Sequence, residues 1–350
     1  QEIDDKSVAD CVEALIGAYL LKSGPKGAIM FMKWFGLNVT DENFKLSDDH
    51  WMDTTFSAIS KCIPDETDAD KLVAELYRKG QMSKFETILG YKFREKSNLV
   101  KAFTHSSYYY NTVTGCYQRF EFLGDAILDY LITRYIYEDN HKFDPGELTD
   151  LRQALVHNEF FGCLAVKYNF HKYLKHLSPD VFSAITHFEQ KFIGHENDLI
   201  YGKFLIVTST TTEYNEEVEI PKILGDIFES VAAAIYLDSG FSLDAVWKVY
   251  YKFFEPLLIR FSENIPKSPS RQLYESDARQ ETKTKFENAT VNEGGIVSVT
   301  VHTHGIKVEG FGKNKRFARQ DAARKAVIAL KKLNKLYTIK SKEVDISISR

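Results

Sequence analysis

The chain has 350 residues, of which 44% are hydrophobic and 27% are charged, and its formal net charge is −4. This balance is typical of a globular protein with two or three domains, and it excludes a largely disordered chain. No apolar run reaches the roughly 18 residues that a membrane span requires, so we expect no transmembrane helix. The four cysteines lie far apart and in no metal-ligand spacing, which indicates reduced thiols inside the cell: Cys11, Cys62, Cys116 and Cys163.

The N-terminal half is predicted to be almost entirely helical. Apolar residues recur at helical spacing between Val8 and Tyr19, so residues 1–35 are expected to form helices. Residues 41–81 mix Asp-rich loops with an expected helix at 69–79, and they are interpreted as a connector. From 82 to 192 the apolar residues recur at spacings of three and four residues, which predicts helix nearly throughout.

Two pairs of carboxylates lie inside apolar segments of the predicted helices. Glu121 and Asp125 are four residues apart, while Asp226 and Glu229 are three apart, so each pair projects from one helix face. Acidic residues are rarely buried unless they are paired or bound to metal. Four converging carboxylates would repel one another, and Mg²⁺ prefers oxygen ligands. The pattern therefore predicts a metal site, although either pair alone is also compatible with a solvated helix face.

Residues 193–220 interrupt this helical pattern. They contain a Ser/Thr tract at 208–212 followed by several glutamates, and they are interpreted as an inserted hairpin or mobile loop. Helix is expected again from about 222 to 262, with one break near Gly240 and another at Pro256.

The C-terminal region changes both its periodicity and its charge. From Pro266 onward there are 18 Lys and Arg against 9 Asp and Glu, whereas residues 1–265 carry a charge of −13, so the C-terminal part is the one that attracts polyanions. A short helix at 270–277 is followed by alternating segments at 284–290, 296–303 and 306–311, which are predicted to be strands. A final helix begins near Arg316, with alanines at spacings of three and four.

Motifs between residues 82 and 262 resemble the ribonuclease III catalytic domain. They comprise the segments 85–93, 102–107, 121–125, 146–158 and 225–236, in that order. The resemblance implies an all-helical endonuclease fold in which Glu121, Asp125, Asp226 and Glu229 are catalytic and bind two Mg²⁺ ions, with Mn²⁺ as a substitute. It also implies that Lys222 lies near the scissile phosphate, a solvated lysine being the alternative, and that Asn158 and Arg152 orient carboxylates. Gln118 departs from the family, which often has a Glu at that position.

The first residues repeat part of this motif. Asp10 and Glu13 have the spacing of Asp226 and Glu229 within a similar apolar helix, and such an internal repeat changes the predicted organisation. Residues 1–40 are therefore expected to be the end of another ribonuclease III domain, with Asp10 and Glu13 as part of its metal site. The chain, which opens on Gln1, is expected to be the C-terminal part of a longer protein.

The residues from Gly310 to Ala326 are similar to those of a double-stranded RNA-binding domain. The α-β-β-β-α order supports this, so residues 266–336 are expected to form a small α+β domain, followed by a tail at 337–350. The resemblance implies phosphate contacts from the basic cluster at the start of the last helix, namely Lys313, Lys315, Arg316 and Arg319. The loop 292–295 lacks the His of the family pattern, which predicts weakened contacts there.

Two ribonuclease III domains followed by one RNA-binding domain imply a specific activity. Such enzymes pair the two domains within one chain and cut both strands of duplex RNA, which yields small RNAs with 5′ phosphates and short 3′ overhangs. An accessory RNA-binding protein is the expected partner, and the cytoplasm, with a nuclear fraction, the expected compartment. The alternatives are a catalytically silent scaffold and an adaptor that recruits a partner.

Overall fold

The computed structural model describes residues 4–37, 66–139, 141–193, 220–277, 283–291 and 295–333. The chain divides into two compact units, residues 1–71 and 72–350. The Asp-rich part of the expected connector, the insert at 194–219, the loop at 292–294 and the C-terminal tail lie outside the described residues. Within the described ranges no helix is long and apolar enough to cross a membrane.

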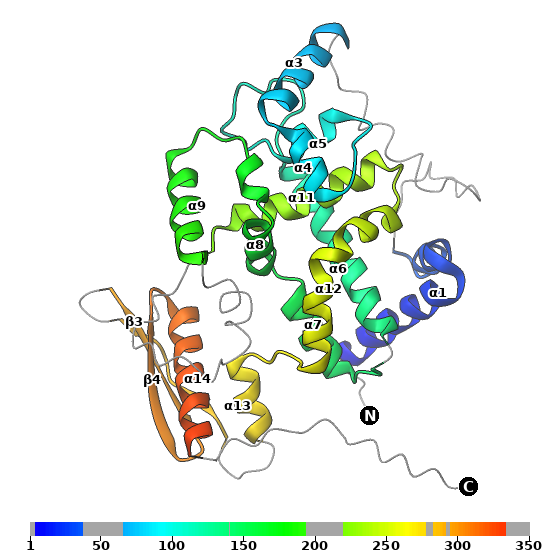
Figure 1. Cartoon of the computed structure of the whole chain (residues 1–350). Coiled ribbons are helices and arrows are strands. Elements are labelled where there is room, and N and C mark those ends of the chain that lie inside the picture. The colour runs from blue at the N-terminus through cyan, green and yellow to red at the C-terminus, as the bar shows by residue number, and fades with distance from the viewer. Residues whose placement is uncertain are drawn as a thin grey trace, which may run out of the picture. The chain divides into compact units, whose positions relative to one another are not determined.

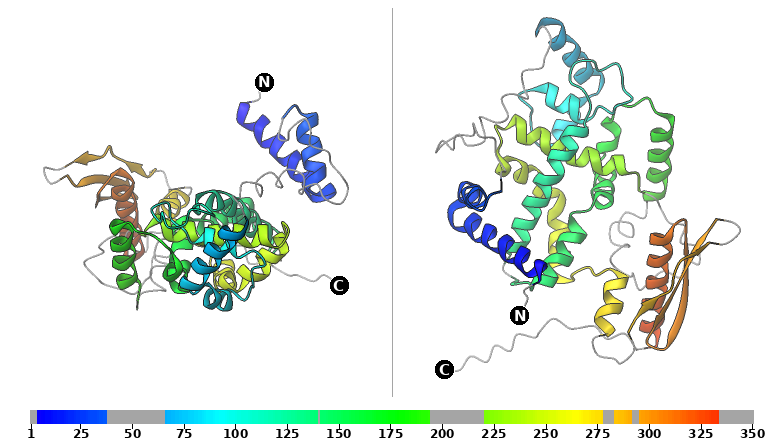
Figure 2. Two further views of the ribbon diagram at one scale, coloured as in Figure 1. Left: turned by 90° about the horizontal axis from the view of Figure 1, so that it is seen from above. Right: turned by 180° about the vertical axis from the view of Figure 1, so that it is seen from behind.

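The first unit contains a long, kinked helix, α1 (Asp5–Trp34). Asp4 caps its start by accepting a hydrogen bond from the backbone N–H of Ser7 at 2.7 Å. At Gly24 the backbone enters the left-handed region with φ of +67°, and Pro25 follows, so the helix bends there into two segments (Figure 2). The helices predicted for residues 1–35 are confirmed.

The second unit begins with a helical body, which agrees with the predicted all-helical fold (Figure 1). Helix α3 (Glu66–Lys79) begins before the division at residue 71 and ends within this unit. The other elements of the body are α4 (Met82–Leu89), α5 (Lys96–Ala102), α6 (Gln118–Glu138), α7 (Pro145–Leu155), α8 (Asn158–Lys167), the 3₁₀ helix η1 (Phe170–Tyr173), α9 (Pro179–Phe192), α11 (Lys222–Asp238) and α12 (Leu243–Glu263).

Helix α11 runs through the core of this body. Fifteen of its 17 residues are buried, because its sequence is apolar on every side rather than on one stripe. Helices α6 and α8 pack against it, and the aromatic rings of Phe161 and Phe228 stack across α8 and α11 with centroids 5.4 Å apart. Tyr250 of α12 is fully buried, and its hydroxyl donates to the Phe228 carbonyl at 2.7 Å. Because this helix is buried on all sides, its backbone is fixed, and so are the positions from which its polar side chains project.

Of the two predicted helix breaks, one is confirmed and one is wrong. Helix α11 ends at Asp238, and Gly240 with φ of +74° turns the chain. Helix α12, in contrast, continues through Pro256. Proline removes only one backbone donor, while Phe253, Leu257 and Phe261 form one buried row that spans the proline and keeps the helix packed against the core.

The C-terminal part forms the predicted α-β-β-β-α unit. It consists of α13 (Pro269–Asp277), β1 (Lys285–Phe286), β2 (Thr290–Val291), β3 (Val297–Thr303), β4 (Ile306–Gly312) and α14 (Lys315–Lys332). The central strand β3 pairs antiparallel with β1, β2 and β4, in a register that places Val301 opposite both Phe286 and Val308. The expected strand at 284–290 is thus two short strands, both on the same neighbour. Leu273, Val301 and the alanines of α14 form the core of this unit.

Candidate metal centre

Three of the four predicted acids converge between helices α6 and α11. One carboxylate oxygen from each of Glu121, Asp226 and Glu229 lies within 4.8 Å of the others, and no second such group occurs in the described part of the chain. Asp226 and Glu229 are buried, whereas Glu121 is half-buried. Asp125 lies outside this group but lines the same hollow of about 300 Å³, together with Gln118, Glu121, Phe122, Val156, His157, Asn158, Lys222 and Glu229.

The convergence depends on how closely the two helices cross. A Cβ placed on Gly124 would lie only 1.8 Å from the backbone oxygen of Glu229, so the backbones touch where no side chain intervenes. Gly225 is packed in a similar way against Asn158 at the start of α8. Gly124 therefore allows α6 and α11 to approach closely enough for their carboxylates to meet, while Gly225 allows α11 to approach Asn158.

Lys222 occupies the space between the acids of the two helices. Its Nζ atom lies 2.5 Å from Glu121 Oε1 and 2.9 Å from Asp226 Oδ1. Burial alone would lower the pKa of this lysine, but the two hydrogen bonds raise it above its ordinary value. A cation is therefore held at the position where the predicted metal site requires one.

Asp226 accepts hydrogen bonds from three different elements. Lys222 and the Nδ2 of Asn158, at 2.8 Å, both donate to Oδ1, while the hydroxyl of Tyr117 donates to Oδ2 at 3.3 Å. Lys222 and Asn158 were predicted site residues, whereas Tyr117 was not. Its spacing was the available signal, because Tyr117 stands one helical turn before Glu121 and so lies on the same face.

The electrostatics of the site favour a bound cation. Burial, followed by the charges of Asp125, Asp226 and Glu121, raises the pKa of Glu229 to about 8. Burial also raises the pKa of Asp226, and burial with the neighbouring Asp129 charge raises that of Asp125. All of these ligand atoms are oxygens, the donor type that Mg²⁺ and Mn²⁺ accept, so the residues present fit a divalent ion.

Three other predicted residues lie elsewhere. Arg152 Nε is 3.2 Å from Asp129, so its ion pair lies one helical turn beyond Asp125 rather than on the converging acids. Asp10 and Glu13 are exposed on α1, where Asp10 pairs with Lys6 at 2.8 Å. They belong to no group of three metal-binding residues among those that the structure describes.

The predicted RNA-binding cluster lies at the start of α14. Lys315 and Arg316 are exposed there, and Asn314 caps the helix by accepting from Phe317 N–H at 3.1 Å. Arg319 stacks over the ring of Phe286 with its guanidinium carbon 4.3 Å from the centroid and donates to the hydroxyl of Tyr274 at 2.9 Å. Lys313 and Arg319 are exposed as well: Lys313 Nζ lies 4.9 Å from the centroid of the Phe317 ring, and Arg319 also joins α14 to α13 and the sheet.

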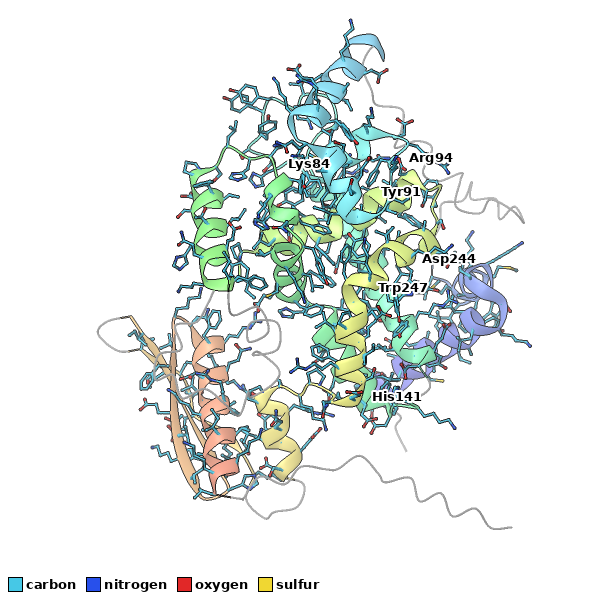
Figure 3. The ribbon with its side chains drawn as sticks, viewed as in Figure 1. Lys84, Tyr91, Arg94, His141, Asp244 and Trp247 are labelled. Atoms are coloured by element: carbon cyan, nitrogen blue, oxygen red, sulfur yellow. The ribbon has the colours of Figure 1, made fainter. Side chains whose placement is uncertain are left out.

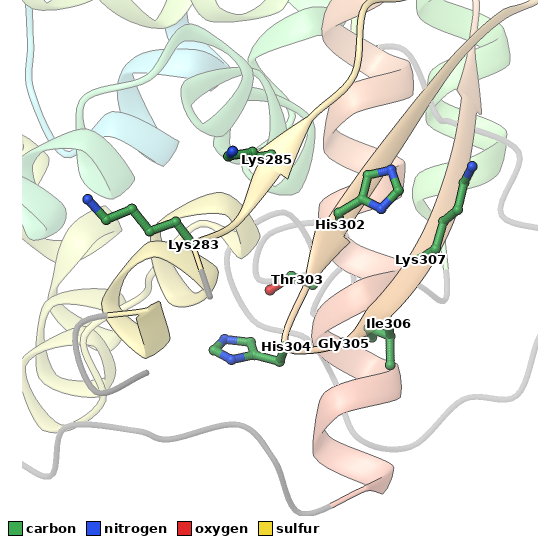
Figure 4. A pocket seen from close by; sticks show the side chains of 8 residues that line it. All are labelled: Lys283, Lys285, His302, Thr303, His304, Gly305, Ile306 and Lys307. Atoms are coloured by element: carbon green, nitrogen blue, oxygen red, sulfur yellow. The ribbon is translucent and has the colours of Figure 1, made fainter. Parts of the chain in front are cut away.

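A second hollow, of about 590 Å³, lies at the turn between β3 and β4 (Figure 4). Among its lining residues, Lys285, His302 and Lys307 are paired in register across β1, β3 and β4. Glu287 accepts a hydrogen bond from His302 at 2.5 Å and lies 3.9 Å from Lys307, so part of this charge is neutralised within the sheet. This hollow was not predicted from the sequence.

Two family models match the chain. The ribonuclease III domain matches residues 118–240, which include all four acids of the candidate centre, and the Dicer double-stranded RNA-binding domain matches residues 246–336. The helical body is therefore similar to a ribonuclease III domain over residues 118–240.

Among curated proteins the chain is similar to Dicer. Endoribonuclease Dicer of Danio rerio is 44% identical over 335 residues, and the match covers 95% of this chain and 18% of that protein. Endoribonuclease Dcr-1 of Drosophila melanogaster is 42% identical over 354 residues, covering 94% and 15% respectively. Endoribonuclease Dicer homolog 1 of Arabidopsis thaliana is 35% identical over 335 residues, covering 94% and 16%. The chain is therefore homologous to a part of Dicer, and it spans less than a fifth of the length of these relatives.

Proposed function

We propose that the chain carries an endoribonuclease that hydrolyses double-stranded RNA with Mg²⁺. The observation that supports this most is the convergence of Glu121, Asp226 and Glu229 oxygens within 4.8 Å, with Asp125 on the same hollow. The names of the similar proteins agree, since each is called an endoribonuclease. The products are small RNAs with 5′ phosphates and short 3′ overhangs, of the kind used in RNA silencing.

The roles of the side chains follow from their contacts. Two divalent ions, Mg²⁺ or Mn²⁺, would supply an activated water and neutralise charge on the phosphate when bound. Glu121, Asp125, Asp226 and Glu229 present the oxygen ligands. Asn158 donates to Asp226 and so fixes its orientation. Lys222, whose ammonium lies beside Glu121 and Asp226, would supply a positive charge for a phosphate oxygen of the RNA. Arg152, through Asp129, has at most an indirect influence.

The test is cleavage of a long RNA duplex with and without Mg²⁺. Wild-type protein is expected to cut, whereas Asp125→Asn combined with Glu229→Gln should bind the duplex but leave it intact. Equal cutting by this double variant would remove Asp125 and Glu229 from the mechanism and contradict the metal site. Failure of the wild type to cut, with RNA binding retained, would favour the alternative, a catalytically silent scaffold that binds RNA or a partner protein.

The C-terminal unit is proposed to bind duplex RNA through Lys313, Lys315, Arg316 and Arg319. Exposed cations at a helix N-terminus suit phosphate oxygens, and the family model describes a double-stranded RNA-binding domain. Titrating duplex RNA at two salt concentrations tests this proposal. An affinity that does not fall as salt rises would exclude phosphate contacts by these residues.

The organisation predicted from the motifs remains part of the proposal. Residues 1–40 end a first ribonuclease III domain whose metal site includes Asp10 and Glu13, 41–81 connect it to the catalytic domain at 82–262, and 266–336 form the RNA-binding domain. The two nuclease domains pair within one chain, and an accessory RNA-binding protein acts as partner. The cytoplasm is the proposed compartment, with which the free thiols of Cys11, Cys116 and Cys163 agree.

A further inference from the structure

Tyr117 is a buried side chain whose polar atom points at the candidate metal centre. It is 5% exposed, and its hydroxyl donates to Oδ2 of Asp226 at 3.3 Å. We propose that Tyr117 is a positioning residue for the metal centre, holding the Asp226 carboxylate in the orientation that ligates the ion. The inference rests on the proposed function for its consequence in cleavage, but metal binding tests it separately.

The three donors on Asp226 divide unequally between its two oxygens. Lys222 and Asn158 both reach Oδ1, whereas Tyr117 is the donor at Oδ2. The terminal torsion of an aspartate is broad and roughly two-fold, so bonds to one oxygen leave the rotation of the carboxylate weakly defined. A donor on the second oxygen restricts that rotation. Each carboxylate oxygen has two lone pairs, so the bond from Tyr117 still leaves one on Oδ2 for a cation.

Tyr117 is itself held in place from the opposite side. Its backbone N–H donates to the carbonyl of Thr104 at 2.9 Å, and its ring lies 6.0 Å from that of His105. Thr104 is buried, and its hydroxyl donates to Val100 O at 2.7 Å and accepts from Asn111 at 2.9 Å. The phenol is thus anchored to the segment after α5 and does not depend on the acids for its position.

The position of Tyr117 also connects the two acidic motifs. Tyr117 directly precedes α6, which carries Glu121 and Asp125, and it bonds to Asp226 on α11. The contact between Gly124 and Glu229 fixes the distance between the same two helices, while the bond from Tyr117 fixes the direction of one ligand. Outer hydrogen bonds of this type typically change metal affinity by about 10- to 100-fold when removed.

The chain offers a matched control in Tyr91, which is labelled in Figure 3. Its hydroxyl donates to Oδ2 of Asp238 at 2.8 Å, and Asp238 is 7% exposed. Asp238 also accepts from the backbone N–H groups of Arg94 and Glu95, and it belongs to no metal-capable group within the described residues. Tyr91→Phe therefore removes the same bond, from a phenol to a buried aspartate, at a place without converging acids.

The experiment measures Mn²⁺ binding to the full 350-residue chain by electron paramagnetic resonance, and duplex cleavage as a function of Mg²⁺. Tyr117→Phe is expected to raise the Kd for Mn²⁺ about tenfold or more, and high Mg²⁺ should restore most of the cleavage rate. Tyr91→Phe should change the Kd by less than about twofold. The rise in Tm that saturating Mn²⁺ produces is a second measurement, which serves even if a variant is less stable, because the ion binds only the folded state.

Two results would overturn the assignment of Tyr117. One is a wild-type Kd in Tyr117→Phe, and the other is an equal loss of Mn²⁺ binding in Tyr91→Phe, which would indicate general destabilisation. The proposed function fails in a different way. If the wild type binds Mn²⁺, loses it in Glu229→Gln and Tyr117→Phe, and yet cuts no RNA, the positioning role stands and the nuclease proposal falls.

Discussion

Replacing Gly124 with alanine is expected to separate the two helices that form the metal centre. The added Cβ would lie 1.8 Å from the oxygen and 2.5 Å from the carbonyl carbon of Glu229, whereas such contacts are not found below 3.0 Å. The helices must therefore move apart by about 1.2 Å at this point. Overpacking of this kind costs about 1–3 kcal/mol of stability, and a misplacement of about 1 Å at a reacting centre costs about 100-fold in rate.

The assay is single-turnover cleavage of duplex RNA at saturating Mg²⁺, with Tm measured in parallel. Gly17→Ala is the matched control, because a Cβ on Gly17, also within a helix, meets nothing within 4 Å. It should gain up to about 1 kcal/mol of helix stability and keep its rate. A Gly124→Ala protein that cuts within about threefold of the wild-type rate would show that the close crossing of α6 and α11 does not set the geometry of the acids.

Three further predictions concern charge. Because the pKa of Glu229 in the folded, metal-free protein is about 8 against an ordinary 4.5, the folded state keeps a proton that the unfolded state loses. Urea unfolding in EDTA should therefore show that the free energy of unfolding falls from pH 5 to pH 8. The apparent affinity for Mg²⁺ should rise with pH up to about 8, because the ion must displace this proton. An affinity that does not depend on pH would contradict the raised pKa. Lys222→Met removes the cation between Glu121 and Asp226, so Mg²⁺ should raise the Tm of this variant more than that of the wild type. An equal rise in Tm would argue that Lys222 and Mg²⁺ do not compete for these carboxylates. Arg316→Ala should lower the slope of log affinity against log salt by about one, and an unchanged slope would place Arg316 away from phosphate.

The helices that carry the acids were predictable, but the details of their environment were not. The spacing of Glu121 with Asp125, and of Asp226 with Glu229, defines one face of each helix whatever the tertiary structure. The ion pair between Lys222 and Glu121 joins residues 101 positions apart, and it depends on the crossing of α6 over α11. Periodicity contains no information about such a crossing, so the role of Lys222 as a partner of both acids could not be derived from the sequence.

The RNA-binding unit shows where local patterns fail. Alternation predicted one strand at 284–290, but only Lys285–Phe286 and Thr290–Val291 form ladders with β3. Between them the pairing is reduced to single contacts, such as the bond from Glu287 N–H to Thr300 O at 2.8 Å. At Pro256 a break was predicted and the helix continues instead, because burial on both sides of the proline outweighed one lost hydrogen bond. In both cases contacts with neighbouring elements, and not the local sequence, determined the secondary structure.

The ammonium of Lys222 among the carboxylates also bears on whether folding requires a bound ion. Many small metalloproteins do not fold until their ion arrives, because nothing else holds the ligands together. Here the chain supplies its own positive charge at 2.5 Å from Glu121 and 2.9 Å from Asp226, so the acids are neutralised in part before any ion is present. We therefore expect the folded state to form in the absence of Mg²⁺, because the lysine offsets part of the repulsion between the acids.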